Sequence, residues 1–386
     1  MSRDDPLTPE NQFASILEID LDAIAENYRR LRSYAPTAET AGVVKADGYG
    51  LGAEAVALRL FHEGCRVFFV ANLDEAMALR WVLPEAAEIA VLNGYSAGDE
   101  QSFIDHRLVP VLNDPGQVER RVADCHRLAA ALPAFLHVDT GMNRLGLSAP
   151  ELAKMAADGD RFDGPQWRAV MSHLACADTP AHPLNQQQLA RFQDARRQLP
   201  QMPASLSNSA GVLTNSAYHF DLTRPGIALY GGEAVLDTVN PMLPTIRLLA
   251  RVLQVRTVAA GDTVGYGASY TADRPRRVAT IAAGYADGYL RAASNVAEVA
   301  VNGTRVPVVG RISMDMHAID VTALPADGGG DIQAGDLVEV FGPAQWVDAT
   351  ADKSQTIPHE FLTRLGKRYH RRYTGKIDLG CQNGTQ

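Results

Sequence analysis

Between residues 40 and 230, eight short apolar runs of strand length alternate with alanine-rich, amphipathic stretches of helical length. Strands that alternate with helices indicate an α/β domain with a parallel sheet, and eight of them match a closed (β/α)8 barrel. An open, doubly wound sheet remains the alternative, because the pattern alone does not show closure. The eight runs lie at residues 40–45, 66–70, 88–92, 108–112, 134–139, 167–174, 203–207 and 221–230.

The pattern changes near residue 235. Helical stretches stop at Val235–Pro244, and most later segments are alternating, β-branched runs. One of them contains Asn302-Gly303, a dipeptide that favours the type I′ turn of a β-hairpin. A chain of 386 residues also exceeds the size at which one hydrophobic core stops growing. We therefore predict a barrel domain at 1–240 and a mainly β domain at 241–386.

Charge and cysteine content exclude several classes of function. The formal net charge of −9 leaves no basic surplus for a nucleic acid or an anionic membrane surface. The four cysteines, Cys65, Cys125, Cys176 and Cys381, form no CxxC or CxxH pair, so neither a metal site nor a disulfide framework is expected. No secretory signal and no apolar run of about 20 residues is present. The sequence predicts a cytoplasmic protein.

Polar residues follow the predicted strands, where a barrel carries its functional groups. Lys45 ends the first strand and is a candidate Schiff-base nucleophile if its amine is partly desolvated. Arg144 follows the fifth strand and could clamp a carboxylate, while His173 ends the sixth. Each has a plainer interpretation when taken alone: a snorkelling lysine, a solvated arginine and a hydrogen-bonded core histidine.

The last two strands carry signals for a phosphate. Asn208 and Ser209 precede a helical stretch, where a hydroxyl and free N–H groups suit an anion. Arg224 is followed by Pro225-Gly226-Ile227, and a glycine there lets backbone amides approach a phosphate closely. A lysine, a phosphate cradle and an arginine clamp on one rim point to pyridoxal 5'-phosphate.

The chain also contains eight motifs, spread over Ile16–Tyr373, whose order and spacing resemble those of the alanine racemases. The resemblance implies a barrel plus a β domain, an amino-acid substrate, and a homodimer in which the partner's β domain completes each active site. It implies interconversion of L-alanine and D-alanine. The motifs are VKADGYGLG, DTGMNRLG, MSHLACAD, SNSAG, RPGIALYG, VGYGASYTA, AAGYADGYLR and GRISMDM.

The resemblance also implies roles for single residues. Lys45 holds the cofactor as an internal aldimine, and Arg144 lies near the substrate carboxylate. Tyr285 acts as a gate at the entryway, and Met314 of the partner offers its backbone near the substrate carboxylate. The expected cofactor-binding residues are Lys45, Tyr49, Asn208, Ser209, Arg224, Gly226, Ile227 and His359.

Racemisation needs a base on each face of a planar carbanion, because one group does not easily reach both sides. By the resemblance Lys45 is one base and Tyr266, from the other subunit, is the second. A tyrosine with a pKa of about 10 is a poor base unless nearby donors favour its phenolate. His173 and Arg224 resemble the network behind it. Arg224 would also face the pyridine nitrogen, where a guanidinium that stays protonated does not act as an acid.

Two positions depart from the family pattern. His137 stands where many relatives carry a lysine that becomes carbamylated and steers the arginine of DTGMNR, so we predict no carbamylated lysine here. His359 stands where the family usually has a tyrosine on the phosphate, and imidazole leaves a pocket of different shape. The substrate range therefore stays open, and a small polar amino acid such as serine is a candidate.

Three alternatives remain at this stage. A broad-specificity amino-acid racemase is the most serious, because only pocket shape separates it from an alanine racemase. A non-catalytic pyridoxal-phosphate carrier would lack the β domain with Tyr266. A decarboxylase of the same fold type would need an acidic contact to the pyridine nitrogen, where Arg224 stands, and a catalytic cysteine motif that Cys381 does not have. Supply of D-alanine for a cell wall and its degradation are equally compatible with the sequence.

Overall fold

The computed structural model describes residues 13–325 and 332–376. They form two compact units: a barrel unit, Ile24–Leu243, and a β unit that joins the described residues through Ala23 to Pro244–Lys376. The sequence-based boundary at residue 240 did not anticipate the N-terminal segment. Residues Ser15–Asp20 form β1, which pairs with β11 (Ile246–Val258) in the sheet of the β unit.

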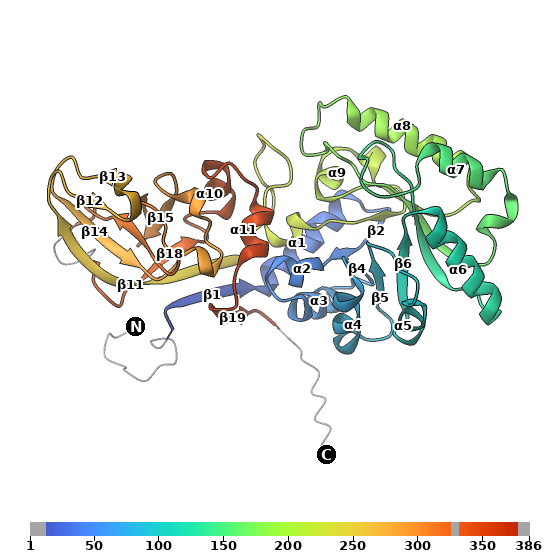
Figure 1. Cartoon of the computed structure of the whole chain (residues 1–386), viewed down its shortest axis with the longest axis horizontal. Coiled ribbons are helices and arrows are strands. Elements are labelled where there is room, and N and C mark those ends of the chain that lie inside the picture. The colour runs from blue at the N-terminus through green and yellow to red at the C-terminus, as the bar shows by residue number, and fades with distance from the viewer. Residues whose placement is uncertain (1–12, 326–331, 377–386) are drawn as a thin grey trace, which may run out of the picture. The chain divides into compact units, whose positions relative to one another are not determined.

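The barrel unit contains a parallel sheet in the order β3-β4-β5-β6-β7-β8-β9, and β2 pairs with β10 (Figure 1). Backbone hydrogen bonds close it: Arg224 N–H donates to Ser207 O at 2.9 Å, and Val43 N–H donates to Pro225 O at 3.2 Å. The predicted barrel is thereby confirmed. Its strands are β2 (Glu39–Thr40), β3 (Gly42–Val43), β4 (Val67–Val70), β5 (Glu88–Val91), β6 (Leu108–Leu112), β7 (Pro133–His137), β8 (Gln166–Met171), β9 (Ala204–Ser205) and β10 (Leu222–Thr223).

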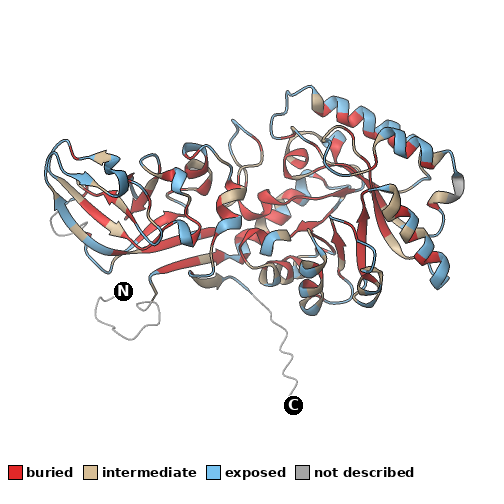
Figure 2. Ribbon diagram, in the orientation of Figure 1, coloured by how far each residue is buried: buried red, intermediate tan, exposed pale blue. Residues whose placement is uncertain are grey.

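Helices separate these strands, and several have clear start signals. Asn72 caps α4 by accepting from Glu75 N–H, and Asp114 caps α6 by accepting from Gln117 N–H. The strands are buried along most of their length (Figure 2), as expected for a parallel sheet covered by helices. The helices are α1 (Leu21–Tyr34), α2 (Lys45–Tyr49), α3 (Ala53–His62), α4 (Leu73–Val82), α5 (Glu100–Asp105), α6 (Pro115–Leu128), α7 (Ala149–Ala156), α8 (Leu184–Arg197) and α9 (Ser209–Thr214), with short 3-10 turns η2 (Gly159–Phe162), η3 (Ser216–Tyr218) and η4 (Ile227–Tyr230).

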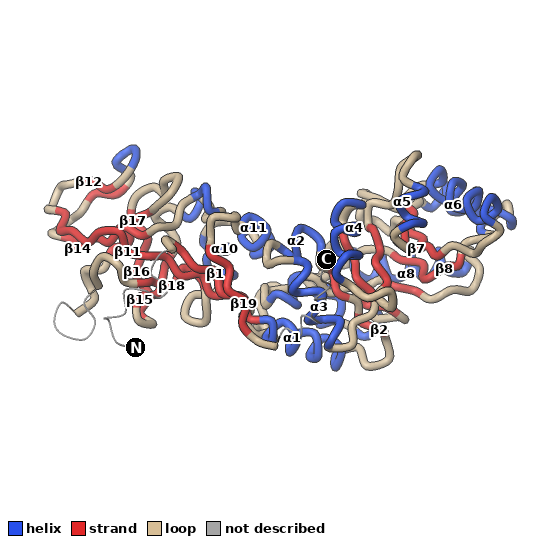
Figure 3. The backbone as a smooth tube through the Cα atoms, turned by 90° about the horizontal axis from the view of Figure 1, so that it is seen from below, coloured by secondary structure: helices blue, strands red, loops and turns tan. Residues whose placement is uncertain are grey.

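The β unit is built around an eight-stranded sheet in the order β14-β17-β16-β15-β18-β11-β1-β19, and an added β14–β11 pairing joins six of these strands into a ring. Strands dominate this unit in the tube view (Figure 3). The predicted hairpin forms between β15 and β16, with Asn302 and Gly303 at φ 48 and 80. The remaining elements are β12 (Thr263–Val264), η5 (Tyr266–Ala268), β13 (Tyr270–Thr271), β14 (Arg276–Ile281), η6 (Tyr285–Asp287), η7 (Arg291–Ala293), β15 (Glu298–Val301), β16 (Thr304–Val309), β17 (His317–Asp320), β18 (Leu337–Phe341), α10 (Val347–Lys353), α11 (Pro358–Arg364) and β19 (His370–Thr374).

Within the described ranges, no helix has both the length and the apolar character needed to cross a membrane. Cys65, Cys125 and Cys176 are free thiols there, and no group of three His, Cys, Asp or Glu residues converges on a possible metal position. Cys381 and the glycine run at 328–330, for which a surface loop is expected, lie outside the described residues.

Candidate active site

Lys45 begins an unusual left-handed turn directly after β3. The next four residues, Ala46, Asp47, Gly48 and Tyr49, have φ values of 53, 55, 60 and 54. A left-handed conformation costs an L-residue about 1–2 kcal/mol, and of these four residues only the glycine avoids that cost. Such backbone strain persists only where surrounding contacts hold it, and it is common at functional sites.

Side chains from neighbouring segments hold this turn in place. Ala46 N–H donates to Glu75 Oε1 at 2.7 Å, and the other oxygen of Glu75 accepts from Ala71 N–H at 2.8 Å. Asp47 Oδ1 accepts from Ala53 N–H at 3.0 Å. Glu75 thus ties the backbone next to Lys45 to the start of α4.

Burial is the main cause that lowers the pKa of the Lys45 amine, and the nearby Arg144 guanidinium lowers it further. The carboxylate of Glu75 acts in the opposite direction and raises it. A lowered pKa increases the neutral fraction of the amine, which is the form that attacks a carbonyl or accepts a proton.

A cradle of hydroxyl and backbone groups lies at the ends of β9 and β10. Ser209 Oγ accepts from Gly226 N–H at 2.8 Å and from Ala228 N–H at 3.3 Å. A Cβ at Gly226 would lie 2.2 Å from the hydroxyl of Tyr49, so the close approach requires glycine. Ile227 begins η4 beside it, and Asn208 caps α9 by accepting from Gly211 N–H. Neutral donors at the start of a helical turn fit a phosphate group.

Arg224 lies buried between the ends of three strands. Its guanidinium donates to Ser205 Oγ and, at 2.6 Å, to Ser172 O. Burial lowers its pKa to about 10, which still leaves the group protonated near neutral pH. Arg224 can therefore donate hydrogen bonds and supply positive charge, but it is a very weak acid.

A buried histidine, His137, and a half-buried one, His173, lie near these cations. Burial is the main cause that lowers the pKa of His137, to about 4, and Arg224 lowers it further. Burial also lowers the pKa of His173, with smaller effects from Arg224, Arg144, His137 and Lys45. Both imidazoles are neutral at pH 7. These mutual effects bring His173 and His137 into one neighbourhood with Lys45, Arg144 and Arg224.

Arg144 lies on an exposed loop that is shaped by Asp139. One carboxylate oxygen of Asp139 accepts from the N–H groups of Gly141, Met142 and Asn143 at 2.9–3.1 Å. Asn143, the residue before Arg144, has a left-handed φ of 56. The loop therefore has a defined shape although the arginine side chain itself faces solvent.

The other predicted site residues belong to the β unit, and three of them are strongly exposed. Tyr266 begins η5 between β12 and β13 with 72% of its surface exposed, and Met314 and Tyr285 are exposed by 53% and 44%. The latter two segments are joined, because Ala286 N–H donates to Met314 O at 2.9 Å. The fourth, His359, lies in α11 and is half-buried.

Sequence reasoning did not single out Asn113 and Glu75, which contact the site. Asn113 directly follows β6, so the rule that functional groups follow barrel strands could have found it. Glu75 is in the first turn of α4, where an acidic residue is ordinary, and no sequence signal distinguishes it.

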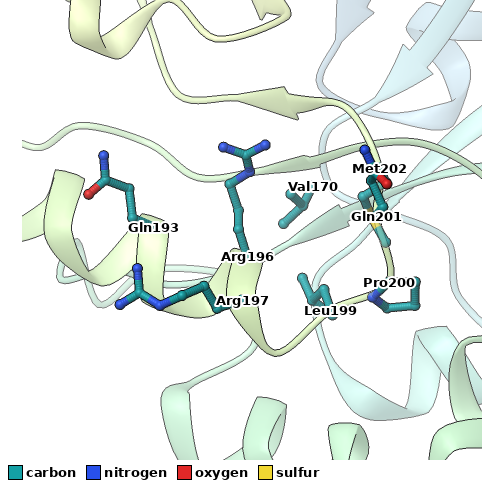
Figure 4. A pocket seen from close by; sticks show the side chains of 8 residues that line it. All are labelled: Val170, Gln193, Arg196, Arg197, Leu199, Pro200, Gln201 and Met202. Atoms are coloured by element: carbon teal, nitrogen blue, oxygen red, sulfur yellow. The ribbon is translucent and has the colours of Figure 1, made fainter.

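A shallow pocket elsewhere on the barrel unit has a different character (Figure 4). It is located beside the amino-terminal end of β9, whereas barrels place their chemistry at the carboxyl ends. Its two arginines are already engaged: Arg197 pairs with Asp194, and the Arg196 guanidinium lies over the Phe220 ring at 5.1 Å. The lining residues are Val170, Gln193, Arg196, Arg197, Leu199, Pro200, Gln201 and Met202.

Comparison with known proteins agrees with this geometry. Residues 19–234 match the family model for the alanine racemase N-terminal domain, and residues 245–373 match that for the C-terminal domain. The chain is 47% identical over 366 residues to a protein of Mesorhizobium japonicum named alanine racemase, catabolic, covering 95% of each chain. It is 45% identical over 368 residues to one of Agrobacterium fabrum named alanine racemase, biosynthetic, covering 92% and 93%.

A solved structure shows the same relationship. The alanine racemase from Bartonella henselae, with covalently bound pyridoxal phosphate, superposes with a TM-score of 0.89 at 42% identity. The match covers 94% of this chain and 99% of the other.

Proposed function

Because the chain belongs to the alanine racemase family and is a pyridoxal-phosphate-dependent alanine racemase, we propose specific roles for its residues in moving the α-proton of alanine. The observation that carries the proposal is the cluster of Lys45, Arg224 and the Ser209–Gly226 cradle at one end of the barrel. The cluster offers an amine of lowered pKa, a fixed cation, and a hydroxyl with neighbouring backbone N–H groups.

These residues fit the cofactor. When bound, pyridoxal phosphate withdraws the electron pair that remains on the substrate after its α-proton leaves. Lys45 would hold the cofactor through its amine, and Tyr49, Ser209 and the backbone at Gly226 and Ile227 would hold the phosphate. Asn208 supports this side through its cap on α9.

Arg224 would face the pyridine nitrogen, and a group that stays protonated supplies a hydrogen bond there without transferring its proton. The charge of Arg224 also helps to keep His173 neutral, and His173 would support the arrangement of this arginine. In the same proposal Arg144 binds the substrate carboxylate, the backbone at Met314 assists it, Tyr285 narrows the entry, and His359 lies on the phosphate side.

Two groups would carry the proton. In one direction the neutral amine of Lys45 accepts the α-proton at Nζ while the Tyr266 hydroxyl donates its proton to the opposite face. In the other direction the Tyr266 oxygen accepts and the Lys45 ammonium donates. Each group needs to reach only one face, which is why two are required.

We further propose that the enzyme is a homodimer with two-fold symmetry, in which each site combines one barrel with Tyr266 and Met314 of the partner subunit. The proposal is supported by the 72% exposure of Tyr266, because a catalytic phenol needs a water-poor surrounding that a solvent-exposed loop does not provide. Two such sites follow from one isologous interface. The free thiols of Cys65, Cys125 and Cys176 support a reducing, cytoplasmic location.

A mixing experiment tests the shared site. The variants Lys45→Ala and Tyr266→Phe, each nearly inactive alone, are unfolded together, refolded and assayed for racemisation. Random pairing makes half of the dimers mixed, each with one intact site, so recovery of about a quarter of wild-type activity is expected. The exposed Lys154→Ala variant serves as an active control.

Absence of recovery after verified subunit exchange would contradict the shared site, as would a fully active monomer. The same assay on a panel of L-amino acids defines the substrate range. Appreciable turnover of serine would favour the broad-specificity alternative, for which the half-buried His359 is the candidate cause.

A further inference from the structure

The hydrogen bonds of Asn113 determine which nitrogen of His137 carries the proton. The side-chain amide of Asn113 donates to Leu92 O and to Val111 O, both at 2.9 Å. Its oxygen lies 2.7 Å from Nδ1 of His137. A flipped amide would place that oxygen against two carbonyl oxygens, so the orientation is fixed by its partners. Because an amide oxygen only accepts, Nδ1 of His137 must be the donor.

The second nitrogen of His137 is then an acceptor. Only 8% of the residue is exposed, and burial with the neighbouring arginines keeps the imidazole neutral at pH 7. A neutral imidazole carries one proton, which Asn113 holds on Nδ1. The lone pair is therefore on Nε2, at the edge of the ring that contains Cδ2.

The Arg144 loop packs against that edge. Leu147 N–H donates to His137 O at 2.8 Å, and Asp139 N–H donates to Leu147 O at 2.9 Å, so the loop folds back onto the end of β7. A Cβ at Gly146 would lie 3.1 Å from His137 Cδ2, the carbon bonded to Nε2. The loop that carries Arg144 is thus adjacent to the free lone pair.

Two guanidinium groups are near enough to influence the pKa of His137, and they differ in how far other groups already hold them. Arg224 already donates to Ser205 Oγ and Ser172 O through its two terminal nitrogens. Across the described ranges, no hydrogen bond or ion pair engages the guanidinium of Arg144. Arg144 is the cation that the lone pair can orient.

We propose that His137 is a positioning residue: its Nε2 accepts a hydrogen bond from Arg144 and aims that guanidinium at the substrate carboxylate, while Asn113 fixes the required tautomer. The part that concerns the substrate rests on the proposed role of Arg144. The part that concerns the tautomer rests on Asn113 alone. A neutral imidazole thereby orients a cation without adding a charge to a site that already holds Lys45 and Arg224.

The first test reads the tautomer directly. Nitrogen NMR of the full chain labelled at histidine, with and without cofactor, should show His137 protonated at Nδ1 and unprotonated at Nε2 near pH 7. The resonances are assigned by their loss in His137→Phe. A proton on Nε2, or a doubly protonated ring, would overturn the proposal whether or not the enzyme racemises alanine.

The second test separates positioning from packing. His137→Phe keeps a ring but removes the acceptor, and we expect KM for alanine to rise about tenfold while kcat changes less, as for loss of one hydrogen bond to a charged group. His137→Gln restores an amide acceptor and should recover part of KM. Equal KM for the two variants, with cofactor absorbance retained in both, would overturn the proposal.

If wild-type enzyme failed to racemise alanine, the proposed function would fall while the NMR result still decided the tautomer. If His137→Phe did not fold, the NMR spectrum would be assigned with His137→Gln instead. An Nε2 that is unprotonated and hydrogen-bonded in the wild type would then support the proposal, and an Nε2 that is unprotonated without a donor would overturn it.

Discussion

The barrel unit and the β unit present their candidate residues in opposite ways. In the barrel, Ser209 and Arg224 are each 4% exposed, and burial lowers the pKa values of Lys45 and Arg224. In the β unit, Tyr266 and Met314 are mostly in solvent. The barrel unit therefore holds these candidate residues in buried, fixed positions, whereas the β unit presents its candidate residues to solvent.

The largest loss of activity is expected from a substitution among the buried residues of the barrel unit. Lys45→Ala removes both the cofactor attachment and one proton acceptor, and racemisation should fall by at least about 10⁴-fold in both directions. The absorbance of a lysine-bound cofactor should disappear at the same time. Retention of that absorbance would show that another amine holds the cofactor and would contradict the proposed role of Lys45.

A substitution of the exposed Tyr266 in the β unit should abolish proton exchange from only one of the two enantiomers. Tyr266→Phe removes one proton donor and acceptor, which is expected to cost about 10²–10⁴-fold. Because Lys45 still serves the other face, exchange of the α-proton with deuterated solvent should survive from one enantiomer and be lost from the other. Small, equal losses from both enantiomers would contradict the division of labour between the two units.

Much of the barrel half follows from the sequence because each strand brings its own end residue to one rim. Lys45 and His173 lie at the ends of predicted strands, Ser209 follows another, and Arg224 follows the observed β10, so closure of the sheet gathers them on one side. The turn after Lys45 was not predicted. Its left-handed backbone at Ala46 and Asp47 depends on contacts from Glu75 and Ala53 that periodicity does not reveal.

The β half is less predictable because its strands pair over long separations in the chain. β1 joins β11 and β19, which are more than 200 and 300 residues away, so no local pattern assigns Ser15–Asp20 to this unit. The role of Tyr266 came from family resemblance, since an exposed tyrosine near a short hairpin has no distinguishing local signal.

Acid should lower the stability of both units, because each contains a buried histidine that is neutral in the folded state. Burial lowers the pKa of His137 in the barrel, and of His317 in the β unit, to about 4. Because the unfolded chain binds these protons from about pH 6.5 downward, their contribution to stability is full above that pH and is lost as pH falls toward 4. Each should cost about 3 kcal/mol over this interval.

Replacing one histidine separates the units. Urea unfolding between pH 7 and 4 should show a shallower loss of stability for His317→Gln than for the wild type, confined to probes in the β unit if the two units unfold separately. An unchanged slope would mean that His317 is protonated before unfolding. Its unpartnered Nε2, buried in the described structure, makes that outcome costly.

The smallest effect is expected from replacing Glu75, whose carboxylate supports the strained backbone that follows Lys45. Glu75→Gln removes the charge that raises the Lys45 pKa, so that pKa should fall. It also replaces one of two oxygens that accept from Ala46 and Ala71, and kcat/KM should drop about three- to tenfold. The pKa is measured from the pH dependence of Lys45 labelling in cofactor-free enzyme.

Asp74→Asn is the matched control, because it removes the same charge from the same turn of α4 and, within the described residues, its carboxylate forms no hydrogen bond or ion pair. If both variants lower the Lys45 pKa equally, the effect is long-range charge and the hydrogen bond to Ala46 has no special role. If only Glu75→Gln lowers the Lys45 pKa, then Glu75, which does not react itself, helps to hold Lys45 in position. In the β unit the situation differs. Within the described residues, no hydrogen bond holds the exposed side chain of Tyr266, which lies on a short hairpin.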